Sequence, residues 1–161
     1  MSTLSLSEKL RQKLNLKRYL DELTALIGRP VHADELGSLE QAASMREAAQ
    51  KFRAQAAQVC EIPFSERCSA RFKGFVHRLQ EANPSSVYIW TPRTINCGTL
   101  IVASLPVVRF DFDFEINDEG ILTFLTGDLE DSLLLDFSVS PIGEQVMRVE
   151  TQGANWARVL F

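Results

Sequence analysis

The stretch Asn83-Pro84-Ser85-Ser86-Val87-Tyr88-Ile89-Trp90 marks the point at which the hydrophobic period of the chain changes. Proline and serine interrupt any helix, and the following four residues favour strands because they are β-branched or aromatic. Upstream, apolar residues recur at helical spacing; downstream, they alternate with polar ones. The sequence therefore predicts a helical half, about residues 1–84, and a sheet half, about residues 86–161.

Three helices are expected in the first half. Leucines spaced at about one helical turn predict a helix over 6–27, which Gly28 and Pro30 end. Ser38 stands three residues before Gln41, the spacing of a capping box, and begins an alanine-rich stretch that predicts a helix over 39–59. A third apolar stripe follows Ser65 and ends at 83.

The second half is expected to hold strands joined by short turns. We expect them at about 87–90, 98–104, 107–116, 120–126, 132–138, 145–152 and 155–161. Connections this short predict antiparallel neighbours, because parallel strands need long crossovers. The predicted fold is one α+β domain over 1–161, with N-terminal helices packed on one face of a C-terminal antiparallel meander sheet.

Composition predicts a folded protein of the cytoplasm. Hydrophobic residues make up 45% of the 161 residues and charged residues 24%, which is typical of globular domains. The first residues lack the basic and apolar regions of a signal peptide. Cys60, Cys68 and Cys97 are odd in number and follow no disulfide or zinc spacing, so reduced thiols are expected.

Charge is distributed unevenly along the chain. Residues 1–106 hold 14 Lys and Arg against 10 Asp and Glu, whereas residues 107–161 hold 3 against 11. An acidic surface repels nucleic acid and membrane phosphates and attracts basic proteins, so neither a nucleic acid nor a membrane is an expected partner. The alternative is that the acidic residues only keep the sheet soluble.

The segment 107–116, with the sequence VVRFDFDFEI, alternates most strictly. Its apolar residues define a core face, and Asp111, Asp113 and Glu115 define a charged face. Alternate carboxylates on a strand lie roughly 6.5 to 7 Å apart, so their repulsion favours a basic partner over them. Arg109, a neighbouring strand or water could also satisfy them.

Metal-dependent catalysis on phosphates, through Asp111 and Asp113, is the alternative function. The Gly-Ser turn that would hold the phosphates in a nucleotidyltransferase is missing before this segment. Asp128, Glu130 and Asp131 form a second acidic cluster, but they lack the ligand pattern of an EF-hand. The sequence contains no nucleotide-binding loop or nucleophile motif either, so we expect no enzyme and no cofactor.

Two further features leave alternatives open. Trp156 either anchors the last strand or presents an aromatic edge to a partner. The first helix carries basic residues that suggest RNA binding, but acidic residues interrupt them and no aromatic residue is interleaved, so a solvated helix face is the expected account. These basic residues are Lys9, Arg11, Lys13, Lys17 and Arg18.

Several short motifs in the second half resemble a known family. They are Val87-Tyr88-Ile89-Trp90-Thr91-Pro92-Arg93, Cys97-Gly98, the FDFDF run, Gly120-Ile121-Leu122, Asp128-Leu129, Leu133-Leu134-Leu135-Asp136-Phe137 and Gly153-Ala154-Asn155-Trp156. The pattern is similar to immunity proteins of bacterial contact-dependent inhibition and related polymorphic toxin systems.

This resemblance implies a small cytoplasmic protein that binds a cognate toxin C-terminal domain and covers its active site. Many such toxins are nucleases with basic clefts, which an acidic surface can occupy. The expectation is a binding protein without catalytic residues, and its oligomeric state stays open. The expected partner-binding residues are Asp111, Asp113, Glu115, Asp128, Glu130, Asp131 and Trp156.

Overall fold

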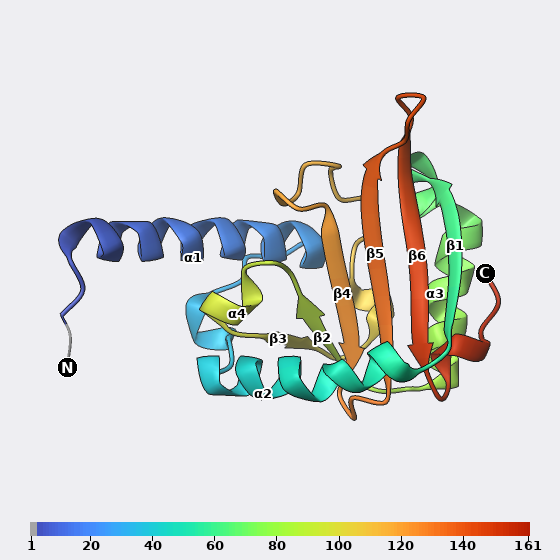
Figure 1. The fold of residues 1–161 in the computed structure, drawn as a ribbon, viewed down its shortest axis with the longest axis horizontal. Helices are drawn as coiled ribbons and strands as arrows, with labels where there is room; N and C mark the ends of the chain where they lie inside the picture. The colour runs from blue at the N-terminus through green and yellow to red at the C-terminus, as the bar shows by residue number, and fades with distance from the viewer. Residues whose placement is uncertain (1–2) are drawn as a thin grey trace.

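The computed structural model describes residues 3–161, apart from the side chain of Arg53. The α+β class with an antiparallel sheet is confirmed (Figure 1). The elements in chain order are α1 (Leu6–Ile27), η1 (Ala33–Glu35), α2 (Leu39–Ala49), η2 (Gln50–Ala54), β1 (Ala57–Pro63), η3 (Phe64–Cys68), α3 (Ala70–Ala82), β2 (Val87–Trp90), α4 (Thr94–Cys97), β3 (Leu100–Val102), η4 (Leu105–Val107), β4 (Ile121–Thr126), β5 (Asp131–Val139), β6 (Gln145–Gly153) and η5 (Trp156–Arg158).

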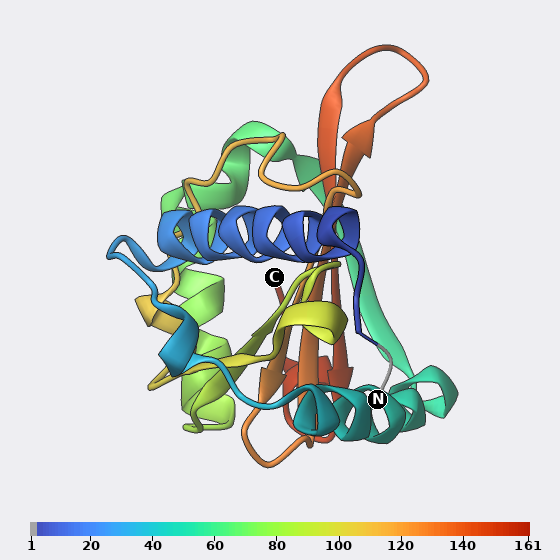
Figure 2. The same ribbon diagram turned by 90° about the vertical axis from the view of Figure 1, so that its left-hand side faces the viewer.

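Six strands form one sheet in the order β1-β6-β5-β4-β2-β3, with every neighbouring pair antiparallel. β4, β5 and β6 form a meander in sequence order. β2 pairs with both β3 and β4, so β3 lies at one edge and β1 at the other. β3 and β4 are both antiparallel to β2, so they run in the same direction, and the chain between them must return along the length of the sheet before β4 begins (Figure 2).

α1 follows the prediction to the residue. Ser5 accepts the amide of Glu8 and Glu8 accepts the amide of Ser5, which is a complete capping box. Gly28 closes the helix with φ 76°, a left-handed conformation that glycine adopts without steric cost.

The predicted second helix over 39–59 is wrong beyond its first part. α2 ends at Ala49, a 3-10 turn follows, and β1 then pairs with β6 so that Cys60 opposes Val149 and Ile62 opposes Met147. Alanine favours a helix locally, but the open edge of β6 supplies hydrogen bonds that residues 57–63 satisfy as a strand. The predicted helical half therefore contains one edge strand of the sheet.

Two predicted strands are also wrong. Residues 107–116 form no strand, and residues 155–161 form a 3-10 turn followed by an extended end. In both places the chain packs against helices and against side chains on the face of the sheet, and no described strand pairs with it. The alternating burial predicted for the first of them is nevertheless present: Val108, Phe110 and Phe112 are buried between exposed polar residues.

The main core lies between the sheet and the layer formed by α1, α3 and the chain before β4. Its largest buried side chains include Trp156, Tyr19, Phe72, Phe75 and Phe124. A smaller cluster of Met45, Phe52 and Leu125 lies on the opposite sheet face, where α2 and η2 cross its end (Figure 1). Among the described residues, no helix has both the length and the apolar character needed to span a membrane.

Candidate functional site

The chain between η4 and β4, residues 109–119, carries most of the predicted charged face, and we call it the acidic segment. Three phenylalanines attach it to the core. The Phe110 ring lies 5.2 Å from that of Phe72, Phe112 lies 5.4 Å from Phe137, and Phe114 lies 5.1 Å from Phe64. Each aromatic contact buries apolar surface, so the segment is held firmly without a strand partner.

Two backbone contacts complete this attachment. The amide of Arg109 donates to the carbonyl of Leu26 at the end of α1 (2.6 Å), and Arg67 donates through Nε to the carbonyl of Phe112 (2.7 Å). The Arg67 guanidinium also lies 4.1 Å from the centre of the Phe64 ring. The end of α1 and the Arg67 side chain of η3 therefore form hydrogen bonds with backbone groups of the segment that a neighbouring strand would otherwise bind.

Fixing the phenylalanines inward places the carboxylates outward. Asp111, Asp113 and Glu115 are all exposed, and none of them forms an ion pair with any residue that the structure describes. Asp118 and Glu119 continue the exposed charge to the start of β4. Among the described residues, only Asp118 of this row forms an ion pair, with Arg93 at 3.4 Å, so the other like charges repel one another without a basic partner.

A groove lies between this row and the C-terminal half of α1, and we call it the acidic groove. It has a volume of about 760 Å³. Its carboxylates are Asp21, Glu22, Asp113, Glu115 and Asp118, and its basic residues are Arg18 and Arg93. Acidic side chains outnumber basic ones, so the groove attracts cationic groups.

Arg93 ties the two walls of the groove together. Its Nε lies 3.2 Å from Glu22 Oε1, and its terminal nitrogens donate to Asn15 Oδ1 (3.0 Å) and Asp118 Oδ2 (3.4 Å). Because Asn15 and Glu22 belong to α1 and Asp118 to the acidic segment, one guanidinium sets the spacing of the walls.

Glu22 is the most unusual carboxyl of the groove. Its residue is 6% exposed, and Thr91 Oγ1 donates to it at 3.2 Å. Burial raises the pKa of Glu22 to about 7, although Arg93 and the hydrogen bond from Thr91 act in the opposite direction. No sequence pattern singled out this residue, because its burial depends on α1 packing against the loop after β2.

The second predicted acidic cluster lies elsewhere. β4 runs from the end of the acidic segment to the turn that holds Asp128 and Glu130, so the two clusters stand at opposite ends of that strand (Figure 1). Six residues at about 3.3 Å each separate them by roughly 20 Å. The two clusters therefore do not form one continuous acidic surface.

Asp131 and Trp156 are both 0% exposed, so the prediction that they lie on a partner-facing surface is wrong. Asp131 accepts four hydrogen bonds, from the amides of Asn155 and Trp156 and from the side chains of Asn83 and Asn155, at 2.8 to 2.9 Å. Trp156 donates through Nε1 to the carbonyl of Leu79 at 2.9 Å. Both residues fasten the C-terminal end to α3.

Asp128 belongs to the same hydrogen-bond network, because Asn83 donates to both Asp128 and Asp131. Burial alone would raise its pKa, but hydrogen bonds from Thr126, the Glu130 amide and Asn83 outweigh that effect and lower the pKa below its ordinary value. Glu130 remains exposed and lies 3.7 Å from Lys51. The residues of this cluster are therefore engaged in holding the β4–β5 turn.

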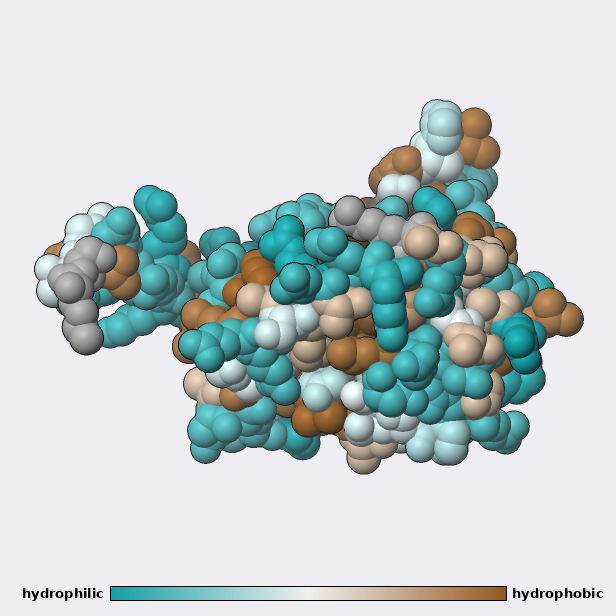
Figure 3. Space-filling model, turned by 60° about the horizontal axis from the view of Figure 1, so that its bottom comes forward, coloured by the Kyte–Doolittle hydropathy of each residue, from teal (hydrophilic) through white to brown (hydrophobic). Residues whose placement is uncertain are grey.

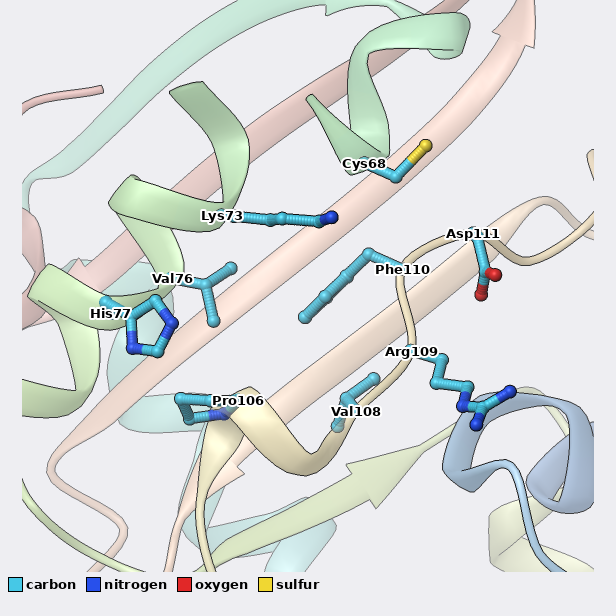
Figure 4. A pocket seen from close by; sticks show the side chains of 9 residues that line it. All are labelled: Cys68, Lys73, Val76, His77, Pro106, Val108, Arg109, Phe110 and Asp111. Atoms are coloured by element: carbon cyan, nitrogen blue, oxygen red, sulfur yellow. The ribbon is translucent and has the colours of Figure 1, made fainter. Parts of the chain in front are cut away.

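A second hollow, of about 450 Å³, lies on the α3 side of the acidic segment (Figure 4). Its floor contains the buried Val76, Val108 and Phe110, and Lys73 extends from α3 across it. Arg109 points away from α3, toward the end of α1. This hollow combines basic groups, one carboxylate and an apolar floor, so its charge does not select one class of ligand.

Among the described residues, no three His, Cys, Asp or Glu side chains gather closely enough to hold a metal ion. Asp111 and Asp113 are both exposed, at alternate positions of an extended chain. No protein-family model, curated protein or solved structure matches the chain.

Proposed function

We propose that this protein is an immunity protein that binds and neutralises the C-terminal domain of a cognate bacterial toxin, a nuclease with a basic cleft. The observation that carries the proposal is the acidic segment. Its phenylalanines pack on the core, while Asp111, Asp113 and Glu115 are exposed and form no ion pair with the described residues; Asp113 and Glu115 also line the acidic groove.

A basic cleft complements this surface in charge. Because the segment is already firmly packed, its backbone loses little conformational freedom on binding. The entropic cost of binding is therefore small. Long-range attraction raises the association rate, and a cleft evolved for phosphates accepts a row of carboxylates in their place. Inhibition then follows from occupation of the substrate path and needs no chemistry from this chain.

The first experiment is affinity purification from the native bacterium, followed by tests of any toxin domain that co-purifies or is encoded next to this gene. Association of the purified pair is measured by stopped-flow at several salt concentrations, and nuclease activity is measured in parallel. We expect rapid, salt-sensitive association and stoichiometric inhibition.

Charge reversal tests the surface itself. Replacing Asp111, Asp113 and Glu115 by lysine should slow association by about tenfold or more at low salt and relieve inhibition. The matched control makes the same charge change at three exposed carboxylates on α2 and α3, namely Glu40, Glu47 and Glu81. Equal association rates for the two triple variants would exclude the acidic segment as the contact surface.

A further inference from the structure

The N-terminal half of α1 stands clear of the rest of the protein (Figure 1). Every side chain from Thr3 to Leu14 is exposed. Within the helix itself these side chains include three leucines: Leu6 is 75% exposed, Leu10 58% and Leu14 49%. In the space-filling view, hydrophobic surface lies among hydrophilic side chains on this protruding end (Figure 3). A helical end without packing contacts is only marginally stable in water. Packing of its leucines against another surface would therefore stabilise it.

The three leucines share one side of the helix because they follow each other at intervals of four residues. The core-packing side of α1 is defined by Tyr19 and Leu23, which are fully buried. Continuing from Tyr19 toward the N-terminus by steps of three or four residues reaches Asn15, Gln12 and Glu8. The leucine stripe therefore lies on the side opposite the one that packs on the protein.

Both borders of this stripe are basic. Lys9, Lys13 and Lys17 follow one border, and Arg11 and Arg18 follow the other. The single carboxylate in this part of the helix belongs to Glu8. It lies on the packing side and accepts the amide of Ser5 at 2.7 Å in the helix cap.

We propose that this half of α1 docks reversibly onto an anionic lipid surface, with Leu6, Leu10 and Leu14 inserted at the headgroup boundary. Apolar residues on one side with lysine and arginine along the borders are the pattern of helices that lie in a membrane interface. Long basic side chains place their stems beside the leucines and their charges at lipid phosphates. The net charge of the chain is −4, and its acidic second half argued against membrane binding, but this half of α1 carries a net positive charge.

Other occupants fit these observations less well. A nucleic acid has phosphates for the basic residues but no favourable contact for three leucines. Protein interfaces are depleted of lysine and rich in aromatic residues, and this stripe has the opposite composition. A second copy of α1 placed against the stripe would bring like charges together along both borders. The proposal does not depend on the toxin-binding function.

The test is co-sedimentation of the full chain with two kinds of vesicle. One contains phosphatidylcholine alone, and the other contains equal parts of phosphatidylcholine and phosphatidylglycerol. We expect binding to the anionic vesicles at least about tenfold stronger than to the neutral ones, and weakening with salt. Replacing Leu6, Leu10 and Leu14 by glutamine should reduce it to the level of neutral vesicles, because glutamine preserves helix propensity.

The matched control places glutamine at three exposed apolar residues outside α1, Val107, Ile142 and Leu160, and should retain binding. Thermal melting shows whether each variant stays folded. Failure of the wild type to sediment with anionic vesicles would overturn the proposal, as would undiminished binding of the leucine variant. So would a dimer that the leucine variant dissociates, or binding to an oligonucleotide in preference to the vesicles.

Discussion

Replacing Glu22 by glutamine should change how the stability of this protein depends on pH. Glu22 has a pKa of about 7 in the folded protein, compared with 4.5 as an ordinary carboxyl. Between these values the folded protein retains a proton that the unfolded chain has released. The free energy of unfolding therefore falls as pH rises from 4.5 to about 7, and this contribution is constant above that.

The size of the effect follows from the shift. Each pKa unit corresponds to about 1.36 kcal/mol, so raising the pKa from 4.5 to about 7 amounts to roughly 3 kcal/mol. Glutamine stays neutral at every pH and keeps an oxygen that can accept from Thr91. Relative to the wild type, E22Q should thus gain up to about 3 kcal/mol between pH 4.5 and pH 8.

Urea unfolding followed by fluorescence, at several pH values across this range, measures the difference between the two proteins. Other titrating groups contribute equally to both and cancel. D21N removes an exposed carboxylate from the same groove and is the matched control. A gain of equal size in D21N would assign the effect to the general charge of the groove. A loss of stability in E22Q at high pH would mean that Arg93 outweighs burial, and would refute the argument.

Three further predictions concern the structural residues and the alternative function. D131A leaves buried amides without an acceptor and should lower the free energy of unfolding by about 2 to 4 kcal/mol, whereas E130A should change it little, as urea unfolding will show. F112A removes a core side chain and should cost about 3 to 5 kcal/mol in the same assay, while D113A should stay within about 0.5 kcal/mol. Magnesium or manganese should leave the melting temperature unchanged in calorimetry; a clear rise would favour the metal-dependent enzyme.

The spacing of apolar residues along the sequence predicted which side chains are buried better than it predicted which segments pair as strands. In the acidic segment, strict alternation indicated which side chains face the core, and Phe110 and Phe112 are buried as expected. The same alternation also predicted a strand, but any extended chain with one buried side produces it. Hydrogen-bonding partners come from distant residues, here Leu26 and Arg67, so the local pattern carries no information about them.

The candidate site divides in the same way. Sequence alone determined that Asp111, Asp113 and Glu115 share an exposed side, because that follows from alternation along one segment. Only the tertiary structure decided that Asp131 is buried and that Glu22 joins the groove. Both depend on which elements pack together, and packing is set by contacts between residues far apart in the chain. The sequence thus defined α1 and the faces of its segments, and the assembled fold decided which faces meet and which remain free.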